Sequence, residues 1–592
     1  MKLGPTKLVS PRDINFLLFD WLKVHDLTTL PHFHHLSTQD FDAVLDLCFD
    51  LAENEFATHN RESDTHEPEF DGTNVTMIPQ IKSALDAFYD AGVLAAQAPM
   101  SVDGGQLPQS VYRACYSFFQ AANLATAAYP MLSAANANLL LAHGSQEQID
   151  TYVLPMLEGR FFGTMCLSEP QAGSSLADIL TRAVPQDDGT YRVTGNKMWI
   201  SGGDHELSEN IVHLVLAKCP GAPAGVRGLS LFIVPKFLVN ADGTLGERND
   251  VVLAGINHKM GYRGTVNTVL NFGDSGQGAI GYLVGEENRG LEYMFHMMNE
   301  ARIGVGAGAV SVAYSSYLHA LDYAKTRGQG RPVDDKDPHA AQTPIINHPD
   351  VRRMLLASKS YVEGGLALVL YAAKVLDEAE ATQDEQESKA STLLLDILTP
   401  IVKGWTSKWS LVANDYAIQI HGGYGYTREY PVEQLWRDNR LNPIHEGTDG
   451  IQAIDLVGRK VSMQDSVAFT ILTDRIKDTI ARAHGVQPEY AQQLTALLES
   501  LTTVTRKLIA ADKLSERIAN ASLYADAFGH IVIGWMWLEQ LLALGDLDDN
   551  FAAGKRLATE YFFTYELANA SQWLDIVSRN PLLFTRPEVS EL

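Results

Sequence analysis

The pattern of apolar positions divides the chain into four stretches, of which the first is helical. Between residues 1 and 160, apolar residues recur at helical spacing, as in the run Phe41, Val44, Leu45, Cys48, Phe49 and Ala52. The Ala-rich range 114–143 predicts one long buried helix, and the polar run 60–76 predicts a loop. Residues 1–160 are therefore expected to form an N-terminal helical domain.

From about residue 161 the pattern changes to short β-type runs that are separated by turn residues. The runs are Tyr191–Val193, Ile211–Ala217, Leu229–Val234 and Val266–Phe272. Short strands at this spacing are typical of a small antiparallel barrel or sandwich. We expect a middle β domain over residues 161–285.

Helical patterning returns after residue 285 and continues into the last stretch. The ranges 294–327, 349–377 and 390–420 predict long helices, and the polar runs 328–344 and 377–388 predict loops. We expect residues 286–460 to form a C-terminal, four-helix-bundle-like domain. The predicted fold class is thus α+β and mainly α.

Residues 461–592 are expected to form an additional helical domain at the C-terminus. One apolar face of a helix there runs through Tyr524, Phe528, Ile531, Trp535, Leu538 and Leu542. We interpret this face as core packing, and a dimer or substrate-tunnel role is the alternative.

Composition and charge exclude several classes of protein. The chain has 592 residues, more than one hydrophobic core usually holds. Apolar residues make up 46% and charged residues 20%, as in globular proteins and unlike disordered or fibrous chains. The net charge of −26 repels phosphate backbones and anionic lipids, so no nucleic-acid partner is expected. A local basic pocket for a small anion remains compatible with this surface.

Cysteine usage and the first residues point to a reducing compartment. The four cysteines are scattered without a CxxC pair and predict neither a disulfide framework nor a metal site. The start MKLGPTKLVSPRDINF lacks the apolar core of a signal peptide, and no uninterrupted apolar stretch is long enough to span a membrane. We expect a soluble, cytoplasmic protein without a membrane span.

Three segments carry residue types that suit chemistry. They are Met165–Ser175 (MCLSEPQAGSS), Lys197–Gly203 (KMWISGG) and Gln419–Thr448, which contains HGGYGY and HEGT. Small residues allow backbone N–H groups to approach a ring or a phosphate closely. Each segment alone also has a structural interpretation: a Gly-Ser turn, a tryptophan in the core, or a glutamate on the surface.

In this order and at this spacing, the segments resemble the acyl-CoA dehydrogenase family. The resemblance covers roughly residues 80–460 and includes the helical–β–helical order. The start SPRDINFLLFDWLKVHDL, the helical tail, NEARIGVGAG (299–308) and HPDVRRMLL (348–356) resemble the larger branch of the family. That branch includes 3-methylmercaptopropionyl-CoA dehydrogenase and some long-chain bacterial enzymes.

The resemblance implies an FAD-dependent oxidation of an acyl-CoA thioester to a trans-2-enoyl-CoA. Glu446 matches the family's catalytic base in the E-G-T motif, and a carboxylate suits this task in an apolar pocket. One branch keeps its base just before the arginine that matches Arg302, but Ala301 cannot act as a base. Glu300 lies about 100° around the helix from that position.

The resemblance also assigns an FAD site to separate parts of the chain. The matching residues are Met165, Leu167, Ser168, Trp199, Ser201, Arg327, Gln419, Gly422, Gly423 and Thr448. Ser168 and Ser201 occupy positions whose hydroxyl, more often that of threonine, bonds the flavin ring. Arg327 matches an arginine that meets the FAD pyrophosphate across a subunit boundary. Three more residues match positions that reach the adenosine half of the neighbour's FAD: Gln419, Gly422 and Gly423. Each FAD is then shared, which implies a homodimer or a higher homo-oligomer.

For the acyl-CoA substrate, the resemblance assigns Ser174 to the CoA arm. Asn299 and Arg302 fall where the family meets CoA or orders the active-site helix, and Gly447 follows the base. Two departures from the family pattern stand out. GQGRPVDDKDP replaces the usual Phe-Gly after the T-R motif, and His445 replaces a tyrosine, either as a packing variant or to tune the base.

Several functional alternatives stay open at this point. The leading function passes electrons to an electron-transferring flavoprotein, while an acyl-CoA oxidase would pass them to O₂. A related flavin oxidase has Asp in place of the base, so Glu446 argues against that class. A catalytically silent FAD-binding protein is a third hypothesis. The substrate is 3-methylmercaptopropionyl-CoA or a fatty acyl-CoA, which implies dimethylsulfoniopropionate degradation or fatty acid metabolism.

Overall fold

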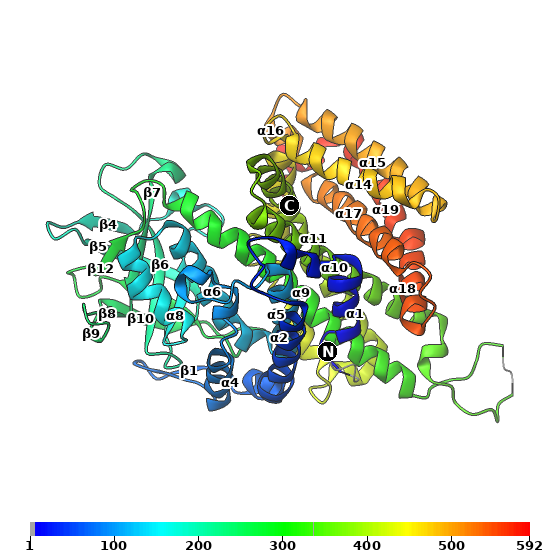
Figure 1. Ribbon diagram of the computed structural model, residues 1–592, viewed down its shortest axis with the longest axis horizontal. Helices are drawn as coiled ribbons and strands as arrows, with labels where there is room; N and C mark the ends of the chain where they lie inside the picture. The colour runs from blue at the N-terminus through cyan, green and yellow to red at the C-terminus, as the bar shows by residue number, and fades with distance from the viewer. Residues whose placement is uncertain (1–5, 335–336, 592) are drawn as a thin grey trace. The chain divides into compact units, whose positions relative to one another are not determined.

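The computed structural model describes residues 6–334 and 337–591, and the chain divides into two compact units (Figure 1). Unit 1 comprises Met1–Leu47, Pro108–Ala121 and Val305–Leu592, and unit 2 comprises Cys48–Leu107 and Ala122–Gly304. The main sheet belongs to unit 2, whereas unit 1 is built from helices.

The main sheet of unit 2 is mixed and mostly antiparallel. Its strands are β3 (Phe161–Cys166), β4 (Arg182–Pro185), β5 (Tyr191–Ser201), β6 (Asn210–Lys218), β7 (Leu229–Pro235), β10 (Val251–Ile256), β11 (Asn267–Phe272) and β12 (Ala279–Leu283). They are ordered β10-β11-β5-β12-β7-β6-β3, and β4 pairs with both β5 and β6. The double pairing of β4 closes a ring of strands, which agrees with the barrel alternative of the predicted barrel or sandwich. The parallel pairing of β3 with β6 departs from an all-antiparallel sheet.

A buried helix covers the β3 side of this sheet. Helix α6 (Leu124–His143) packs on β3, and its Asn136 donates from Nδ2 to the carbonyl oxygens of Thr164 and Val212, at 3.1 and 2.9 Å. Ser133 of the same helix accepts from the backbone N–H of Gly163 at 3.0 Å. These bonds fix the strand that leads into the first chemical segment.

The prediction of one helix over 114–143 is wrong, because the helix is interrupted at Asn123. Helix α5 is Gln109–Ala122 and α6 begins at Leu124. Asn123 has extended backbone angles, and its side chain accepts from the backbone N–H of Thr126 at 3.0 Å. An N-cap of this kind starts a new helix inside an otherwise helical apolar pattern.

The segment 60–76 is also more regular than the predicted loop. It contains α3 (Asn60–Thr65) and a short antiparallel hairpin of β1 (Glu69–Phe70) and β2 (Val75–Thr76). The other elements of unit 2 or shared with it are α2 (Thr38–Leu51), α4 (Pro79–Asp90), α7 (Gln146–Gln148), α8 (Leu154–Leu157), β8 (Phe237–Val239) and β9 (Leu245–Arg248).

Long helices form the centre of unit 1. They are α9 (Gly290–Thr326, from Val305 on), α10 (Pro349–Ala381) and α11 (Glu385–His421), with α1 (Pro11–Asn15), α12 (Val432–Asn439) and α13 (Asp449–Gly458) around them. The predicted loop 377–388 is mostly helical. Asp384 caps α11 by accepting from the backbone N–H of Gln386 at 2.8 Å, and the acidic residues after it stabilise the positive end of the helix.

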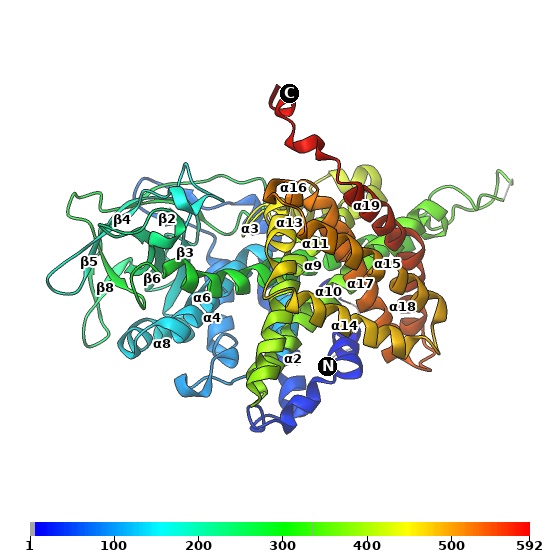
Figure 2. The same ribbon diagram turned by 90° about the horizontal axis from the view of Figure 1, so that it is seen from above.

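The C-terminal stretch packs on these helices within unit 1. Its helices are α14 (Val467–Ala483), α15 (Pro488–Ile509), α16 (Leu514–Ile518), α17 (Ala521–Leu544), α18 (Asn550–Tyr561) and α19 (Leu567–Arg579). Figures 1 and 2 both draw α14, α15, α17 and α19 side by side, and α17 also contacts α10, α11 and α13. In Figure 2 the chain after α19 extends away from the bundle.

Helix α17 is the core of this arrangement. Tyr524, Phe528, Ile531, Trp535 and Leu538 are fully buried or nearly so, which confirms core packing, and only Leu542 of the predicted face is half-buried. By length and composition α17 could cross a membrane, and among the helices of residues 6–334 and 337–591 it is the one that meets these two criteria. However, 83% of the most apolar 18-residue stretch of α17 is buried inside the protein, as in the core helix of a globular domain.

A buried charge cluster joins the start of the chain to its last helices. The Nζ of Lys555, on α18, lies 2.5 Å from an oxygen of Asp13 on α1 and 2.9 Å from an oxygen of Glu363 on α10. Tyr314 on α9 donates to Asp13 at 3.0 Å. Removing one partner from a buried cluster leaves an uncompensated charge, which typically costs about 3–5 kcal/mol. The N-terminal helix and the tail therefore form one unit with the central helices.

We expect Gly529→Ala to destabilise the protein. A Cβ at Gly529 of α17 would lie 2.4 Å from Cδ1 of Trp405 on α11, so the helices must move apart. Overpacking of this kind costs about 1–3 kcal/mol. The control is Gly485→Ala, where a Cβ meets no atom within 4 Å. Thermal unfolding of both variants tests this, and an unchanged melting temperature in Gly529→Ala would show that the α11–α17 contact is loose.

Candidate functional site

Two of the chemical segments meet within unit 2. Met165 lies in β3, and Leu167 and Ser168 follow it directly. The backbone N–H of Met198 in β5 donates to the carbonyl oxygen of Ser168 at 3.0 Å. The strand predicted to end near residue 194 continues to Ser201, so Trp199 and Ser201 lie in β5 itself rather than in a turn after it.

A buried ion pair fixes the segment that contains Ser168. Lys197 of β5 is fully buried, and its Nζ lies 2.9 Å from the carbonyl oxygen of Leu167 and 3.1 Å from Oε1 of Glu169. Glu169 also accepts from the backbone N–H groups of Leu180 and Thr181, at 2.6 and 3.0 Å. Burial alone raises the pKa of Glu169, but Lys197 and these donors outweigh it and lower that pKa to about 2. Glu169 is therefore a carboxylate over the whole physiological range.

Trp199 presents an open aromatic surface beside this segment. Its side chain is 59% exposed, and its φ of +66° is left-handed, which is rare for a bulky residue. Such an outlier persists only where surrounding structure enforces it, and it marks a candidate functional position. Ser201 accepts from Nδ2 of Asn267 at 3.3 Å, which leaves its own hydrogen for another acceptor.

The chain after β5 is fixed by a second buried lysine. The Nζ of Lys236 lies 2.7 Å from an oxygen of Asp204 and donates to the carbonyl oxygen of His205 at 3.1 Å. Arg248 contacts the other oxygen of Asp204 at 3.0 Å. Lys236 and Arg248, which lie outside the Lys197–Gly203 segment, thereby hold the turn that follows Ser201.

The predicted CoA residues fall on a loop and a helix of unit 2. Ser174 lies on an exposed loop, whereas Asn299 and Arg302 lie about one turn apart on α9, the first half-buried and the second buried. Glu300, the alternative base, has its two carboxylate oxygens 3.1 and 3.0 Å from Nδ2 of Asn138 on α6. The Glu300 carboxylate therefore has a hydrogen-bond donor from α6 of the same unit.

In unit 1, the E-G-T segment contains two consecutive residues with left-handed backbones. The φ of Glu446 is +53° and that of Gly447 is +86°. Gln452 donates from Nε2 to the carbonyl oxygen of Glu446 at 3.0 Å, and Lys403 donates from Nζ to that of Gly447 at 2.6 Å. Thr448 then caps α13 by accepting from the backbone N–H of Ile451 at 3.3 Å.

His445, the departure from the family pattern, connects the same segment to helix α9. Its Nε2 lies 3.0 Å from Oδ1 of Asn442, whose Nδ2 donates to Asn439, which in turn donates to the carbonyl oxygen of Ala309 at 3.0 Å. Since this Oδ1 can only accept, His445 is the donor through Nε2. Burial, followed by the charge of Lys403, lowers the pKa of His445 to about 3. His445 is thus neutral at physiological pH and acts as a fixed donor.

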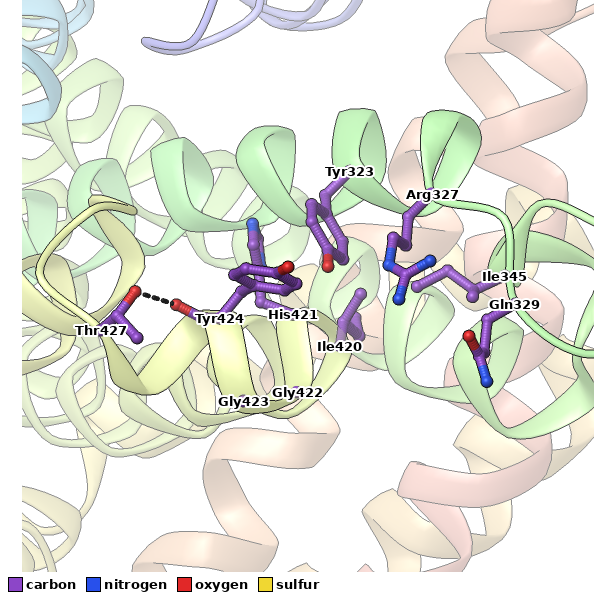
Figure 3. Close-up of a pocket in the computed structure, with 10 residues that line it drawn as sticks. All are labelled: Tyr323, Arg327, Gln329, Ile345, Ile420, His421, Gly422, Gly423, Tyr424 and Thr427. Atoms are coloured by element: carbon purple, nitrogen blue, oxygen red, sulfur yellow. Dashed lines mark hydrogen bonds between the residues drawn. The ribbon is translucent and has the colours of Figure 1, made fainter.

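A pocket of about 470 Å³ lies at the end of α11 in unit 1 (Figure 3). Its lining residues are Tyr323, Arg327, Gln329, Ile345, Ile420, His421, Gly422, Gly423, Tyr424 and Thr427. Figure 3 shows Tyr323 of α9 and Arg327, the residue directly after α9, projecting toward the helix end that carries His421 and Gly422. Three of the four residues predicted for a neighbour's FAD line this pocket. The fourth, Gln419, is exposed on the last turn of α11, where its carbonyl oxygen accepts from Gly422.

The pocket has the chemistry of a nucleotide site. A guanidinium is suited to a diphosphate by paired hydrogen bonds. Gly422 has a φ of +61°, and a Cβ on Gly422 or Gly423 would meet no atom within 4 Å, so the backbone there faces open space. Tyr323 and His421 stack with ring centroids 4.3 Å apart and form a flat aromatic wall. These residues fit the pyrophosphate and adenosine parts of FAD.

Sequence reasoning did not identify the residues that hold these segments in place. Lys197, Lys403 and Gln452 were not among the candidates, although lysines inside the apolar runs NKMWI and IVKGW were a visible signal. A lysine between residues that must be buried requires a partner inside the protein. Across residues 6–334 and 337–591, no group of three or more His, Cys, Asp or Glu side chains could hold a metal ion.

Three family models match the chain. The acyl-CoA dehydrogenase middle domain matches residues 164–275, the acyl-CoA dehydrogenase C-terminal domain matches 288–461, and a domain described as acetyl-CoA dehydrogenase C-terminal like matches 472–582. The last of these covers the extra helices α14–α19.

Curated relatives and solved structures agree with these matches. A 3-methylmercaptopropionyl-CoA dehydrogenase of Ruegeria pomeroyi is 41% identical over 76% of this chain and 75% of its own length. A broad-specificity linear acyl-CoA dehydrogenase of Mycobacterium tuberculosis is 34% identical over 98% of this chain and 96% of its own. The crystal structure of an acyl-CoA dehydrogenase from Bacillus anthracis, complexed with FAD, shares the fold with a TM-score of 0.75 at 20% identity, covering 95% of this chain and 91% of that one.

We expect Lys197→Met to destabilise unit 2 in a pH-dependent way. The Glu169 pKa of about 2 lies below the unfolded value, so the carboxylate stabilises the fold above about pH 4.5 and loses that effect as the pH falls toward 2. Without Lys197 burial raises the Glu169 pKa, so the deficit of the variant should be larger at pH 7 than at pH 4. We expect a loss of about 3–5 kcal/mol at pH 7.

Chemical unfolding of Lys197→Met between pH 4 and 7 measures this deficit. The control is Lys82→Met, which removes an exposed pair with Asp86 on α4 and should change stability by less than about 0.5 kcal/mol. Equal stability of the two variants at pH 7 would mean that the buried pair does not hold the Ser168 segment.

Proposed function

The chain belongs to the acyl-CoA dehydrogenase family, and on that basis we propose that it oxidises an acyl-CoA thioester to its trans-2-enoyl-CoA with FAD as cofactor. The observation that carries the proposal is the fixed, left-handed backbone of Glu446 and Gly447. The Glu446 carboxylate is the one at the E-G-T position, and both left-handed peptides around it have their carbonyl oxygens bound by side-chain donors. A base held this rigidly suits proton abstraction from a positioned substrate.

In the proposed reaction Glu446 removes the proton from the α-carbon of the acyl group. FAD, when bound, supplies the acceptor for the hydride that leaves the β-carbon. The backbone N–H of Glu446 is proposed to donate to the thioester oxygen and to stabilise the negative charge that develops there. Gln452 and Lys403 bind the carbonyl oxygens of Glu446 and Gly447 and so hold the backbone that presents this N–H and the carboxylate.

The proposed FAD site draws on both parts of the candidate site. We propose that the flavin ring of one subunit is held by five residues of unit 2: Met165, Leu167, Ser168, Trp199 and Ser201. Arg327, Gly422 and Gly423 are proposed to meet the pyrophosphate and adenosine of the partner's FAD, with Gln419 and Thr448 nearby. The fit of the pocket to a nucleotide and the FAD bound by the Bacillus anthracis protein support this assignment. Such sharing requires at least a homodimer.

The proposed substrate is 3-methylmercaptopropionyl-CoA or a linear fatty acyl-CoA. We propose that its CoA and thioester groups are bound by Ser174, Asn299, Arg302 and Gly447. The names of the two relatives support one alternative each. Anaerobic bleaching of the flavin by a panel of acyl-CoA chain lengths, including the sulfur-containing one, decides between them. We propose an electron-transferring flavoprotein as the acceptor, and peroxide release in air would instead identify an oxidase.

We expect Glu446→Gln to abolish flavin bleaching by every acyl-CoA tested. Glutamine keeps the shape but cannot take a proton, and a positioned base contributes about 10²–10⁴-fold in rate. The variant should remain folded and yellow, because the proposed ring contacts lie on other residues.

The matched control for this test is Glu300→Gln, which changes the alternative base considered from the sequence. It should bleach within a few-fold of the wild-type rate. Wild-type bleaching in Glu446→Gln together with loss in Glu300→Gln would place the base on α9.

We expect Arg327→Ala to lower FAD occupancy and to weaken the oligomer at the same time. Both effects follow if the guanidinium meets the diphosphate of the partner's FAD. The control is Arg353→Ala, which removes a guanidinium paired with Asp350 on the surface of α10. Absorbance and light scattering measure the two properties, and a wild-type monomer with full FAD would contradict this prediction.

A further inference from the structure

Lys403 is a fully buried ammonium whose contacts converge on the segment that carries Glu446. Its Nζ donates to the carbonyl oxygen of Gly447 at 2.6 Å and lies 3.8 Å from Oδ1 of Asp449. Taking a charged lysine out of water is costly unless the protein supplies hydrogen-bonding partners. These partners are the residue directly after the proposed base and the first residue of α13.

The helix that carries Lys403 is held tightly from both sides within unit 1. A Cβ at Gly306 of α9 would lie 2.4 Å from the carbonyl oxygen of Val402, so the two helices are in direct backbone contact there. On the other side Trp405 packs against Gly529 of α17 and donates to Nδ1 of His530 at 3.1 Å. Lys403 therefore extends from a backbone that has little freedom to shift.

The turn that Lys403 contacts is one that the chain does not adopt by itself. Glu446 has a side chain and a left-handed φ of +53°, and Gly447 follows with +86°. Non-glycine residues rarely occupy this region unless the surroundings enforce it. Two side chains bind the carbonyl oxygens of this turn: Gln452 donates to that of Glu446 at 3.0 Å and to that of Gly447 at 3.4 Å, and Lys403 donates to that of Gly447 at 2.6 Å. Of the two donors, only Lys403 is charged, and hydrogen bonds from charged donors are the stronger kind.

We propose that Lys403 is a positioning residue for Glu446: its buried ammonium, bound to the Gly447 carbonyl, holds the left-handed turn that aims the carboxylate and the N–H of Glu446. This inference rests on the proposed function, in which Glu446 is the base. Lys403 itself takes no proton from the substrate, because its Nζ is bonded to the backbone of the segment.

The test is Lys403→Met in the FAD-loaded full-length protein, with anaerobic flavin bleaching by a straight-chain acyl-CoA. Methionine fills a similar volume without a donor. We expect kcat per bound FAD to fall about 10–100-fold, as when a catalytic group is misplaced by about an ångström. KM and FAD content should stay within about two-fold, because Lys403 binds the proposed substrate residue Gly447 at its carbonyl oxygen rather than at its N–H, and the proposed flavin-ring contacts lie in unit 2. Lys403→Gln, which keeps a neutral donor, should recover part of kcat.

The matched control is Lys555→Met, the same change at another fully buried lysine of unit 1 that contacts Asp13 and Glu363 instead. It should lower thermal stability while its folded, FAD-loaded fraction keeps the wild-type kcat. Wild-type kcat in Lys403→Met, or an equal fall of kcat in both variants, would overturn the proposal.

Two further variants keep the test decisive. If Lys403→Met does not fold, Gln452→Leu removes the other donor to the same turn and should lower kcat at unchanged KM. A wild-type kcat in Gln452→Leu would then overturn the proposal. Glu446→Gln separates the two hypotheses: if that variant bleaches normally, the base is misassigned, whereas a dead Glu446→Gln with a normal Lys403→Met refutes only the role of Lys403.

Discussion

Buried ammonium groups that donate to backbone carbonyl oxygens occur at three of the segments for which we propose chemistry or directly beside them. Lys197 binds the carbonyl of Leu167, Lys236 that of His205, and Lys403 that of Gly447. Each lysine also has a carboxylate close by, on Glu169, Asp204 and Asp449 respectively. The segments are irregular, so their carbonyl groups lack partners from helices or sheets, and buried polar groups without partners are costly. In each case a long side chain from another part of the chain supplies the donor.

The extra C-terminal helices belong to the same physical system. Helix α17 is the buried core of its stretch, and it packs against α11, the helix from which Lys403 extends. Arg517, just before α17, also donates to the carbonyl oxygen of Val457 at the end of α13. The cluster of Lys555, Asp13 and Glu363 joins α18 to the first helix and to α10. The tail therefore stabilises the helices that carry the Glu446 segment and is not an independent module.

Much of the fold follows from local patterning. The alternation of short β-type runs predicted the sheet of unit 2, and the helical spacing predicted α9, α10, α11 and α17 within a few residues. The misses have local causes that periodicity does not reveal. Asn123 ends one helix and caps the next, and Asp384 starts α11 inside an acidic run that otherwise looks like a solvated loop. In both cases one capping side chain decides where backbone N–H groups find partners.

The sequence by itself determined the family and the fold class, because several motifs in a set order resemble one family, and the same resemblance names Glu446 as the candidate base. It also placed Arg327, Gly422 and Gly423 together as candidates, and the tertiary structure lines one pocket with them. Only the tertiary structure decided which distant side chains hold these segments. Lys403 lies 44 positions from Gly447 and Asn439 lies 130 positions from Ala309. Such contacts depend on how helices pack, and packing leaves no period in the sequence near the residues that it holds.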